Sequence, residues 1–296
     1  MNIVSIDIGG TAIKYALLSE AADILYEGKI PTPYELSEFK KSIVKIVKDY
    51  EKSYEIEAVG ISMPGFINSN TGFAERGGAL TFLDQTNIID LFSDELSFPI
   101  FIENDANCVA LAESGYGNAV GVSDFLVLTV GTGIGGALYL NDELYTGGQF
   151  QAGELGKMRI NYSTHPHATL HEFAAMPPLI RNYKALDFED TPEMVTGEYI
   201  FEHAKKNEKV QQLITDWVDT LCVGIFNMAV TLNPQKILIG GGVSENPDYI
   251  ALINERMHKI LEWDDFEVPI TACKFHNRAG IMGAYHLAKE KLSTRD

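Results

Sequence analysis

The sequence predicts an α/β protein with a mostly parallel sheet, because short apolar strands alternate with segments of helical spacing. Residues 2–8 form a β-branched strand run, and two further runs at 14–18 and 24–30 complete a β-meander. The alternation then continues with a helix at 34–50, a strand at 58–63, a helix at 88–96, a strand at 100–103 and a helix at 106–114.

The opening pattern occurs a second time near the middle of the chain. An apolar strand at 125–130 runs into residues 131–136, of which four are glycine, and a returning strand follows at 137–140. The first strand likewise runs into the Gly-Gly-Thr turn at 9–11. We therefore hypothesise an internal duplication of two hairpins that each offer backbone amides.

Helical patterns dominate from residue 168 onward, and they are interrupted by a strand that feeds three glycines at 240–242. The expected elements of this C-terminal part are one long helix or two at 208–232, a strand at 236–239, a helix at 247–261, a strand at 268–275 and a closing helix at 279–291.

We expect a hinge near the Gly-Tyr-Gly of residues 115–117, between the helix at 106–114 and the second strand and glycine turn.

The composition of the 296 residues excludes several classes of protein. Lys and Arg number 23 against 41 Asp and Glu, and the resulting net charge of −18 argues against a nucleic-acid or membrane partner. We expect no signal peptide, because Asp7 interrupts the first apolar stretch, and the sequence has no apolar run of the roughly 18–20 residues that span a bilayer. The scattered Cys108, Cys222 and Cys273 make no disulfide framework, so we expect a cytoplasmic location.

The first glycine turn has the residue types of a phosphate site. Asp7 ends a strand, Gly9 and Gly10 let backbone N–H groups approach phosphate oxygens, and Thr11 and Lys14 add a hydroxyl and an ammonium. Mg²⁺ favours carboxylate and phosphate oxygens, so Asp7 is a candidate to hold it, directly or through water. The alternative is a tight hairpin whose carboxylate is satisfied by the protein.

Two further glycine clusters strengthen the phosphate interpretation. Residues 131–136 contain a Gly-x-Gly-x-x-Gly string, but a strand follows it where a dinucleotide-binding fold needs a helix. The sequence also lacks the P-loop motif. The cluster at 240–242 could receive an adenine and a ribose near a helix N-terminus. Three such clusters on one chain indicate a nucleoside triphosphate site.

Four polar side chains of the segment Glu103–Asn107 end a strand and open a helix. A helix N-cap explains one of them, either Asn104 or Asp105. A carboxylate beside a carboxamide suits vicinal hydroxyls, and a carboxylate can accept the proton of an attacking hydroxyl. We therefore expect a sugar site with a catalytic base here.

Together these motifs resemble the ROK family of sugar kinases and related repressors. The resemblance implies a two-domain actin/hexokinase-like (ribonuclease H-like) ATPase fold, with ATP and sugar in the interdomain cleft, and an ATP-dependent carbohydrate kinase. The matching stretches, in the family's order over nearly the whole chain, are residues 7–14, 60–68, 103–107, 129–136, 147–156, 237–242 and 279–284.

The resemblance also implies roles for single residues, with Asp105 as the base that activates the attacking hydroxyl, usually on C6. The residues expected to bind the sugar are Asn104, Asp105, Glu154, Glu172, Gly65 and Gly78. The residues expected to bind ATP, with Asp7 toward its Mg²⁺, are Asp7, Gly9, Gly10, Thr11, Lys14, Gly131, Thr132, Gly133, Gly135, Gly240, Gly241 and Gly242.

The implied domains divide these roles between two parts of the chain. A smaller domain of residues 1–116 plus 284–296 would carry the first hairpin and the sugar site. A larger domain of residues 117–283 would carry the second hairpin, the adenosine site and the two sugar-binding glutamates. Because relatives are commonly dimers, we expect a homodimer whose small-molecule partners are the sugar and ATP.

The chain departs from the family's zinc motif. Lys157 stands where the family has a histidine after Gly-Glu-x-Gly, and residues 161–171 contain no cysteine. We therefore expect no structural zinc, and we interpret His165, His167 and His171 as part of a polar loop.

The same departures bear on the substrate, because the missing histidine borders the C1–C2 side of the sugar in zinc-bearing members. The loop at 76–79 also lacks the Pro-Asn of the family's glucokinases. The pattern is similar to β-glucoside kinases, which phosphorylate disaccharides such as cellobiose at the 6-hydroxyl. A glucokinase and an N-acetylmannosamine kinase remain open alternatives.

A non-enzymatic, sugar-sensing regulator is an alternative from another functional class. Repressors of the family carry a helix-turn-helix domain before the first strand. Here the first strand begins at residue 2, and the charge of −18 opposes DNA, so we expect an enzyme.

Overall fold

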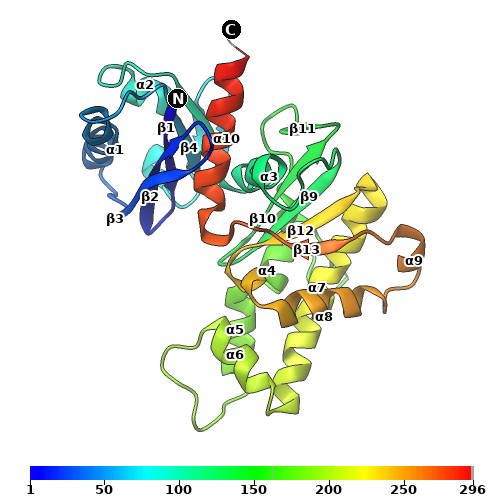
Figure 1. The fold of residues 1–296 in the computed structure, drawn as a ribbon. Coiled ribbons are helices and arrows are strands. Elements are labelled where there is room, and N and C mark those ends of the chain that lie inside the picture. Colours follow the sequence, from blue (N-terminus) through cyan, green and yellow to red (C-terminus); the bar gives the residue numbers. More distant parts are fainter. Residues whose placement is uncertain (162, 295–296) are drawn as a thin grey trace. The chain divides into compact units, whose positions relative to one another are not determined.

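The computed structural model describes residues 1–161 and 163–294, which form two compact units (Figure 1). Unit 1 consists of Met1–Gly121, Leu144–Ala152 and Asn277–Asp296, and unit 2 of Val122–Glu143 and Gly153–His276. Each unit is built around a five-stranded sheet with helices, which confirms the predicted α/β class. That these units are the folding domains predicted from the sequence stays a prediction.

The main sheet of unit 1 has the strand order β3-β2-β1-β4-β8. Strands β1 (Asn2–Ile8), β2 (Ala12–Ser19) and β3 (Ile24–Pro31) form the predicted antiparallel meander. Strands β4 (Ala58–Met63) and β8 (Ile100–Asn104) continue the sheet in parallel with β1. The carboxyl ends of β1, β4 and β8 therefore lie at one edge of the sheet.

Four helices complete the framework of unit 1. Helix α1 buries an apolar face against the sheet core, as its spacing predicts, and α10 contacts α3, β1, β4 and β8. Helix α2 is capped by the side chain of Asn87 and is shorter than predicted. The bounds of these helices are α1 (Leu36–Glu51), α2 (Ile88–Ser93), α3 (Asp105–Tyr116) and α10 (Ala279–Ser293).

A second, three-stranded sheet of unit 1 is not among the predicted elements. It has the order β5-β6-β7, and its strands are β5 (Phe66–Asn68), β6 (Phe73–Arg76) and β7 (Thr86–Asn87). A 3-10 turn, η1 (Thr81–Leu83), lies between β6 and β7. Strands of two to four residues are too short to show an alternation with a period of two.

The sheet of unit 2 has the order β11-β10-β9-β12-β13. Strands β9 (Phe125–Val130) and β10 (Ile134–Leu140) are antiparallel, whereas β12 (Lys236–Gly240) and β13 (Ile270–Ala272) continue in parallel, with β11 (Glu143–Leu144) at the edge. Strand β13 is shorter than the predicted 268–275. When the five strands of each sheet are numbered in chain order, both sheets have the order 3-2-1-4-5. This shared order supports the hypothesis of an internal duplication.

The helices of unit 2 pack mainly around α7 (Glu208–Leu232), one continuous helix that contacts α4, α5, α6 and α8. Within the described residues α7 alone is long and apolar enough to cross a membrane, but half of its most apolar window is buried inside the protein, as in a core helix. The remaining helices and 3-10 turns of unit 2 are α4 (Leu170–Ala174), α5 (Met176–Lys184), α6 (Gly197–Ala204), α8 (Pro247–Met257), α9 (Trp263–Phe266), η2 (Leu155–Lys157) and η3 (Gly242–Glu245). The turn η4 (His276–Arg278) begins at the last residue of unit 2 and continues into unit 1.

The packing of α10 against α3 depends on Gly283, because a Cβ there would lie 1.8 Å from the carbonyl oxygen of Cys108. Gly283→Ala should therefore lower the free energy of unfolding by about 2 kcal/mol, measured by denaturant titration. Gly148→Ala is the matched control, since an added Cβ at this exposed residue meets nothing within 4 Å. A Gly283→Ala variant as stable as the control would contradict the packing described.

Candidate functional site

Polar residues gather at the carboxyl edge of the main sheet of unit 1. Asp7 of β1 is in register with Ser62 of β4, and Ser62 with Glu103 of β8. Asp105 begins α3 directly after β8. Ligands of open α/β sheets bind at this edge, so the fold places Asp7 and Asp105 where a ligand is expected.

The Asp7 carboxylate is half-buried and has two side-chain partners. Its Oδ1 accepts a hydrogen bond from the Ser62 hydroxyl at 2.9 Å, and its Oδ2 lies 3.6 Å from Lys14 Nζ. Lys14 Nζ also donates to the carbonyl oxygen of Asn277 at 2.9 Å. Burial raises the pKa of Asp7, although Lys14 and Ser62 act in the opposite direction.

Glycine allows α10 to approach this carboxylate. A Cβ on Gly280, in the first turn of α10, would lie 2.2 Å from Asp7 Oδ1. Any larger residue at position 280 would displace the carboxylate or the helix. The glycine at position 280, within the stretch 279–284 that resembles the ROK family, is therefore required by this close approach.

The first glycine turn is held through its carbonyl groups. The Thr32 hydroxyl donates to the carbonyl oxygen of Gly9 at 2.7 Å, and the Thr32 N–H donates to that of Thr11 at 3.2 Å. The Tyr34 hydroxyl donates to the carbonyl oxygen of Gly10. These bonds anchor the turn without engaging the N–H groups of Gly10 and Thr11. Nothing in the sequence pattern singled out Thr32 or Tyr34.

Asn104 is the N-cap of α3, which decides between the two capping interpretations. Its Oδ1 accepts from the N–H groups of Ala106 at 2.9 Å and Asn107 at 3.2 Å, and its Nδ2 donates to the carbonyl oxygen of Gly65 at 2.9 Å. Asp105 Oδ1 accepts from the Ala106 N–H at 2.8 Å. The Asp105 carboxylate is therefore oriented by the first turn of the helix without serving as its cap.

The Asp105 residue keeps an exposed surface, but protein atoms surround its carboxyl group. This desolvation raises the pKa of Asp105, and the negative charge on Asp7 raises it further, whereas the Ala106 N–H lowers it. Both carboxyl groups at this edge are thus disfavoured as anions. A cation bound at this edge would relieve this cost.

Glu103 is a buried support behind this pair, with 2 % of its surface exposed. Its carboxylate accepts from the Asn104 N–H at 2.8 Å and from Asn107 Nδ2 at 2.9 Å, and Ser69 is a further hydrogen-bond partner. Burial raises the pKa of Glu103 despite these bonds. Glu103 therefore positions the segment that carries Asp105.

Two predicted sugar-binding glycines lie against each other beside Asn104. Gly65 has a φ of +110° and Gly78 a φ of +61°, both in the region that favours glycine. A Cβ on Gly78 would lie 3.2 Å from the Gly65 nitrogen, and one on Gly65 would lie 1.9 Å from the carbonyl oxygen of Arg76. Unit 1 thus brings Gly65, Gly78 and Asn104 together.

The second and third glycine clusters lie together in unit 2, because β9 and β12 are parallel neighbours whose ends meet. The Gly131 N–H donates to the carbonyl oxygen of Gly133 at 2.9 Å and closes the turn. Gly241 has a φ of +84°, and a Cβ there would lie 2.1 Å from the carbonyl oxygen of Val130. The two turns are therefore packed backbone against backbone.

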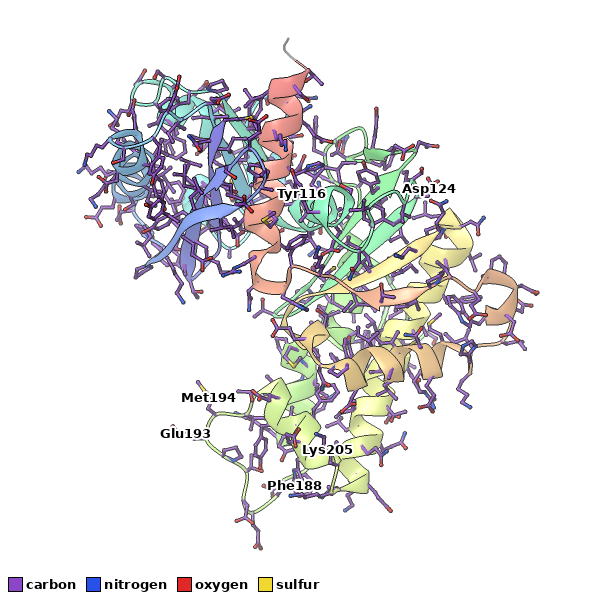
Figure 2. All side chains as sticks on the ribbon, in the orientation of Figure 1. Tyr116, Asp124, Phe188, Glu193, Met194 and Lys205 are labelled. Atoms are coloured by element: carbon purple, nitrogen blue, oxygen red, sulfur yellow. The ribbon has the colours of Figure 1, made fainter. Side chains whose placement is uncertain are left out.

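A cavity of about 580 Å³ opens beside these turns, a size that suits a small molecule. Gly131, Thr132 and Gly242 of the predicted site line it. Helix α6 adds Phe201 and Lys205, of which Lys205 is labelled in Figure 2. These α6 residues were not predicted from the sequence, because nothing in the helical pattern distinguishes a wall of a cavity from a solvated face.

Two predicted residues of this region have structural partners. His171 lies beneath the glycine turn, where its Nδ1 accepts from the Ile134 N–H at 3.4 Å, and a Cβ on Gly133 would lie 2.7 Å from its ring. Glu172 forms a capping box with Thr169, whose N–H and hydroxyl both donate to the Glu172 carboxylate. The Thr169 groups lower the pKa of Glu172.

Glu154 lies at the start of the 3-10 turn η2, in which Lys157 is exposed. This turn is packed closely against β10, since a Cβ on Gly156 would lie 2.2 Å from the carbonyl oxygen of Ile134. Sugar contacts of Glu154 and Glu172 stay predictions.

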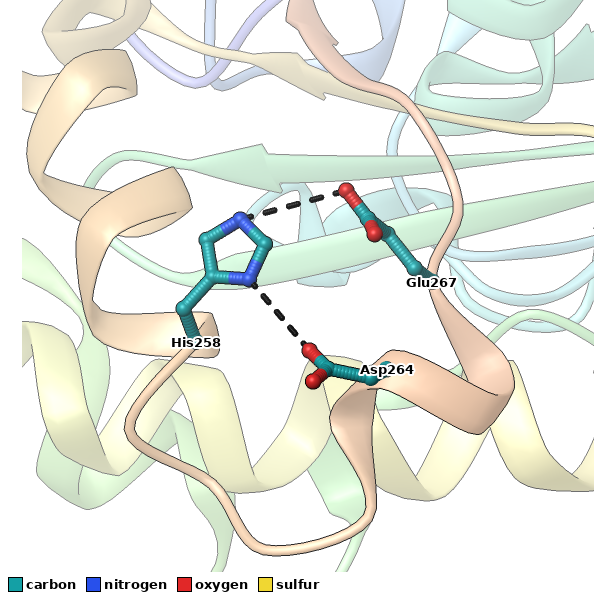
Figure 3. A group of neighbouring side chains, drawn as sticks. All are labelled: His258, Asp264 and Glu267. Atoms are coloured by element: carbon teal, nitrogen blue, oxygen red, sulfur yellow. Dashed lines mark ion pairs between the residues drawn. The ribbon is translucent and has the colours of Figure 1, made fainter.

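One group of three potential metal ligands occurs among residues 1–161 and 163–294, and it is far along the chain from Lys157 (Figure 3). His258 Nδ1 lies 3.7 Å from Asp264, and its Nε2 lies 3.8 Å from Glu267. The two carboxylates thus face opposite nitrogens of the ring, which suits ion pairs with a protonated histidine. All three residues are exposed, and we assign no metal to them.

Comparisons with known proteins place these features in one family. A model described as the ROK family matches residues 3–291. The β-glucoside kinase of Listeria monocytogenes serovar 1/2a is 34 % identical, over 98 % of this chain and 99 % of that protein. The N-acetyl-D-glucosamine kinase of Haemophilus influenzae is 30 % identical, over 94 % and 96 %. A ROK family protein of Streptococcus pneumoniae, solved with sucrose, has a TM-score of 0.87 and 26 % identity, with full coverage of both chains (100 % each).

The raised pKa of Glu103 predicts a pH effect on stability. The folded state favours the protonated form of Glu103. The contribution of this group to the free energy of unfolding is therefore complete below its unfolded pKa of about 4.3, and it is lost as the pH rises through the folded pKa. In denaturant titrations from pH 4 to 7, Glu103→Gln should gain stability relative to wild type.

Asp49→Asn is the control for this prediction, because Lys52 and Lys45 lower the pKa of the exposed Asp49. Asp49 therefore contributes stability above its unfolded pKa. As the pH rises, Asp49→Asn should lose stability relative to wild type, whereas Glu103→Gln should gain it. Equal pH dependence of wild type and Glu103→Gln would contradict the burial cost assigned to Glu103.

Proposed function

This chain belongs to the ROK family, and we propose that it is an ATP-dependent sugar kinase in which Asp105 is the general base. The observation that carries the proposal is the pairing of Asp7 and Asp105 at one sheet edge, beside a glycine turn anchored through its carbonyl groups. A phosphoryl transfer enzyme needs a cation site, backbone donors and a base close together. Asp7, the glycine turn at 9–11 and Asp105 of unit 1 have the residue types suited to these three roles.

The acceptor that we propose is the 6-hydroxyl of a β-glucoside such as cellobiose, or of glucose. The similarity to β-glucoside kinases supports this substrate class. So do Lys157, in place of the family's zinc histidine, and the loop at 76–79, which lacks the glucokinase Pro-Asn. In zinc-bearing members the histidine borders the C1–C2 side of the sugar, so a site without it would suit a second ring attached at C1.

ATP would be bound by the glycine turns that the sequence predicted. In unit 1 the N–H groups of Gly10 and Thr11, with Lys14, are suited to phosphate oxygens. In unit 2 the cavity lined by Gly131, Thr132 and Gly242 has the size and the aromatic wall that an adenosine requires. Mg²⁺ that accompanies ATP would neutralise phosphate charge, and Asp7 would hold it, directly or through water.

The reaction follows from these positions. The sugar 6-hydroxyl attacks the γ-phosphorus, its oxygen forms the new P–O bond, and the bond to the bridging oxygen of ADP breaks. Asp105 accepts the proton of the hydroxyl, and the raised pKa of Asp105 improves the match with that proton. Lys14 adds positive charge near the phosphates.

The remaining parts of the proposal concern the setting of the enzyme. The two compact units would be the folding domains, and the protein would act as a homodimer in the cytoplasm. The three cysteines are free and buried, which is consistent with a reducing compartment.

Replacement of the base tests the mechanism. Asp105→Asn removes the proton acceptor but keeps the side-chain shape, so kcat should fall by roughly 10²- to 10⁴-fold, while the Kd for ATP changes by less than about threefold. Wild-type activity should decline as the pH falls through the raised pKa of Asp105, because the base must be ionised. A coupled ADP-release assay and calorimetry measure these quantities.

Asp90→Asn is the matched control, since Asp90 is an exposed aspartate in the first turn of α2 in the same unit. Its kcat should remain that of wild type. Full activity of Asp105→Asn would remove Asp105 as the base.

The substrate is tested by the same assay with cellobiose, glucose, N-acetylmannosamine and N-acetylglucosamine. We expect the highest kcat/KM with cellobiose. No ADP release with any sugar, together with sugar binding in calorimetry, would favour a regulator over the proposed kinase.

A further inference from the structure

A hollow of about 500 Å³ in unit 1 is not used by the proposed reaction. Three aromatic rings line it, those of Phe66, Phe73 and Phe150. Polar side chains also line it, including Glu75 and Gln85. The described residues that line the hollow include no lysine or arginine, so its chemistry suits a neutral molecule and not a phosphate.

The small sheet builds one wall of this hollow by strand alternation. Ile67 of β5 and Ala74 of β6 are fully or almost fully buried and belong to the core cluster of unit 1. Their neighbours Phe66 and Phe73 are only partly buried and lie on the opposite face. The sheet therefore presents aromatic side chains outward on the face that forms the hollow.

The segment of residues 144–152 supplies another wall, and its backbone is strained there. Phe150 has a φ of +56°, a conformation that a bulky residue rarely adopts. Strain of this kind persists where the surrounding structure imposes it, and it is concentrated at ligand sites. A glycine at this position would be relaxed, so the presence of phenylalanine points to a use for the ring.

The hollow is fixed next to the catalytic segment by hydrogen bonds at both ends of β5. Before the strand, the carbonyl oxygen of Gly65 accepts from Asn104 Nδ2 at 2.9 Å. After it, Ser69 is a hydrogen-bond partner of Glu103. Asn104 and Glu103 are the two residues that precede Asp105. The strand that forms one wall of the hollow is therefore tied to the segment that carries Asp105.

We propose that this hollow is the subsite for the aglycone of a β-glucoside, the second pyranose or aryl ring attached through the oxygen on C1. A pyranose presents apolar C–H faces and a rim of hydroxyl groups, which the three rings and the polar wall complement. Glu75, Gln85 and Gln149 are the side chains available to the hydroxyls. This proposal rests on the proposed function and names the part of the site that selects disaccharides over glucose.

The test compares cellobiose with glucose as acceptors for wild type, Phe150→Gly and Phe73→Ala. Phe150→Gly removes one ring and relaxes the backbone, so the variant should fold at least as well as wild type. Each variant should raise KM for cellobiose about tenfold, the loss expected of one stacked ring. The KM for glucose, the KM for ATP and both kcat values should stay within about twofold.

Tyr145→Ala is the matched control, because Tyr145 is an exposed aromatic residue of the same segment that does not line the hollow. It should leave both KM values unchanged. Three outcomes would each overturn the subsite and leave the kinase proposal standing. They are an equal rise in KM for glucose and cellobiose, an unchanged KM for cellobiose in Phe150→Gly, and a wild type that phosphorylates glucose but not cellobiose. A wild type that phosphorylates neither sugar would overturn both.

Discussion

The electrostatic coupling of Asp7 and Asp105 is the constraint on which the candidate site depends. The two carboxylates lie at one edge of the main sheet of unit 1, where burial disfavours both charges and the charge on Asp7 further disfavours that on Asp105. Ser62, Lys14 and the first turn of α3 offset part of this cost. A divalent cation at Asp7 would relieve the uncompensated part of this cost, which also raises the proton affinity of Asp105.

Close packing of α10 keeps this pair in place. Glycines let the helix contact the sheet and α3 without intervening side chains: Gly280 lies against Asp7 and Gly283 against Cys108, while Gly60 of β4 lies against the backbone of Ala284. Stability and function are therefore linked in unit 1, because a change that moves α10 also moves the Asp7 carboxylate. The hollow beside Asn104 is attached to the same framework through β5. The proposed subsite would therefore share its framework with the candidate site.

Long elements and glycine-rich turns could be predicted from the sequence, because each carries a local pattern. The bounds of α7 and β4 agree with the prediction, and the carboxylates at 7 and 105 were recognised from their place at strand ends. The small sheet was missed, since strands of two to four residues show no period. No local pattern marks Thr32 and Tyr34, which donate hydrogen bonds to the carbonyl groups of the first glycine turn. The same holds for Phe201 in the cavity wall, because all three roles depend on contacts between distant parts of the chain.

A carbon-13 NMR titration of the Asp105 carboxyl carbon, in wild type and in Asp7→Asn, tests the coupling most directly. We expect a pKa for Asp105 above the ordinary aspartate value of about 3.9 in wild type, and a lower pKa in the variant, because the neighbouring charge is gone. An ordinary pKa in wild type, or a raised pKa that Asp7→Asn leaves unchanged, would contradict the claim that the two carboxylates act as a pair.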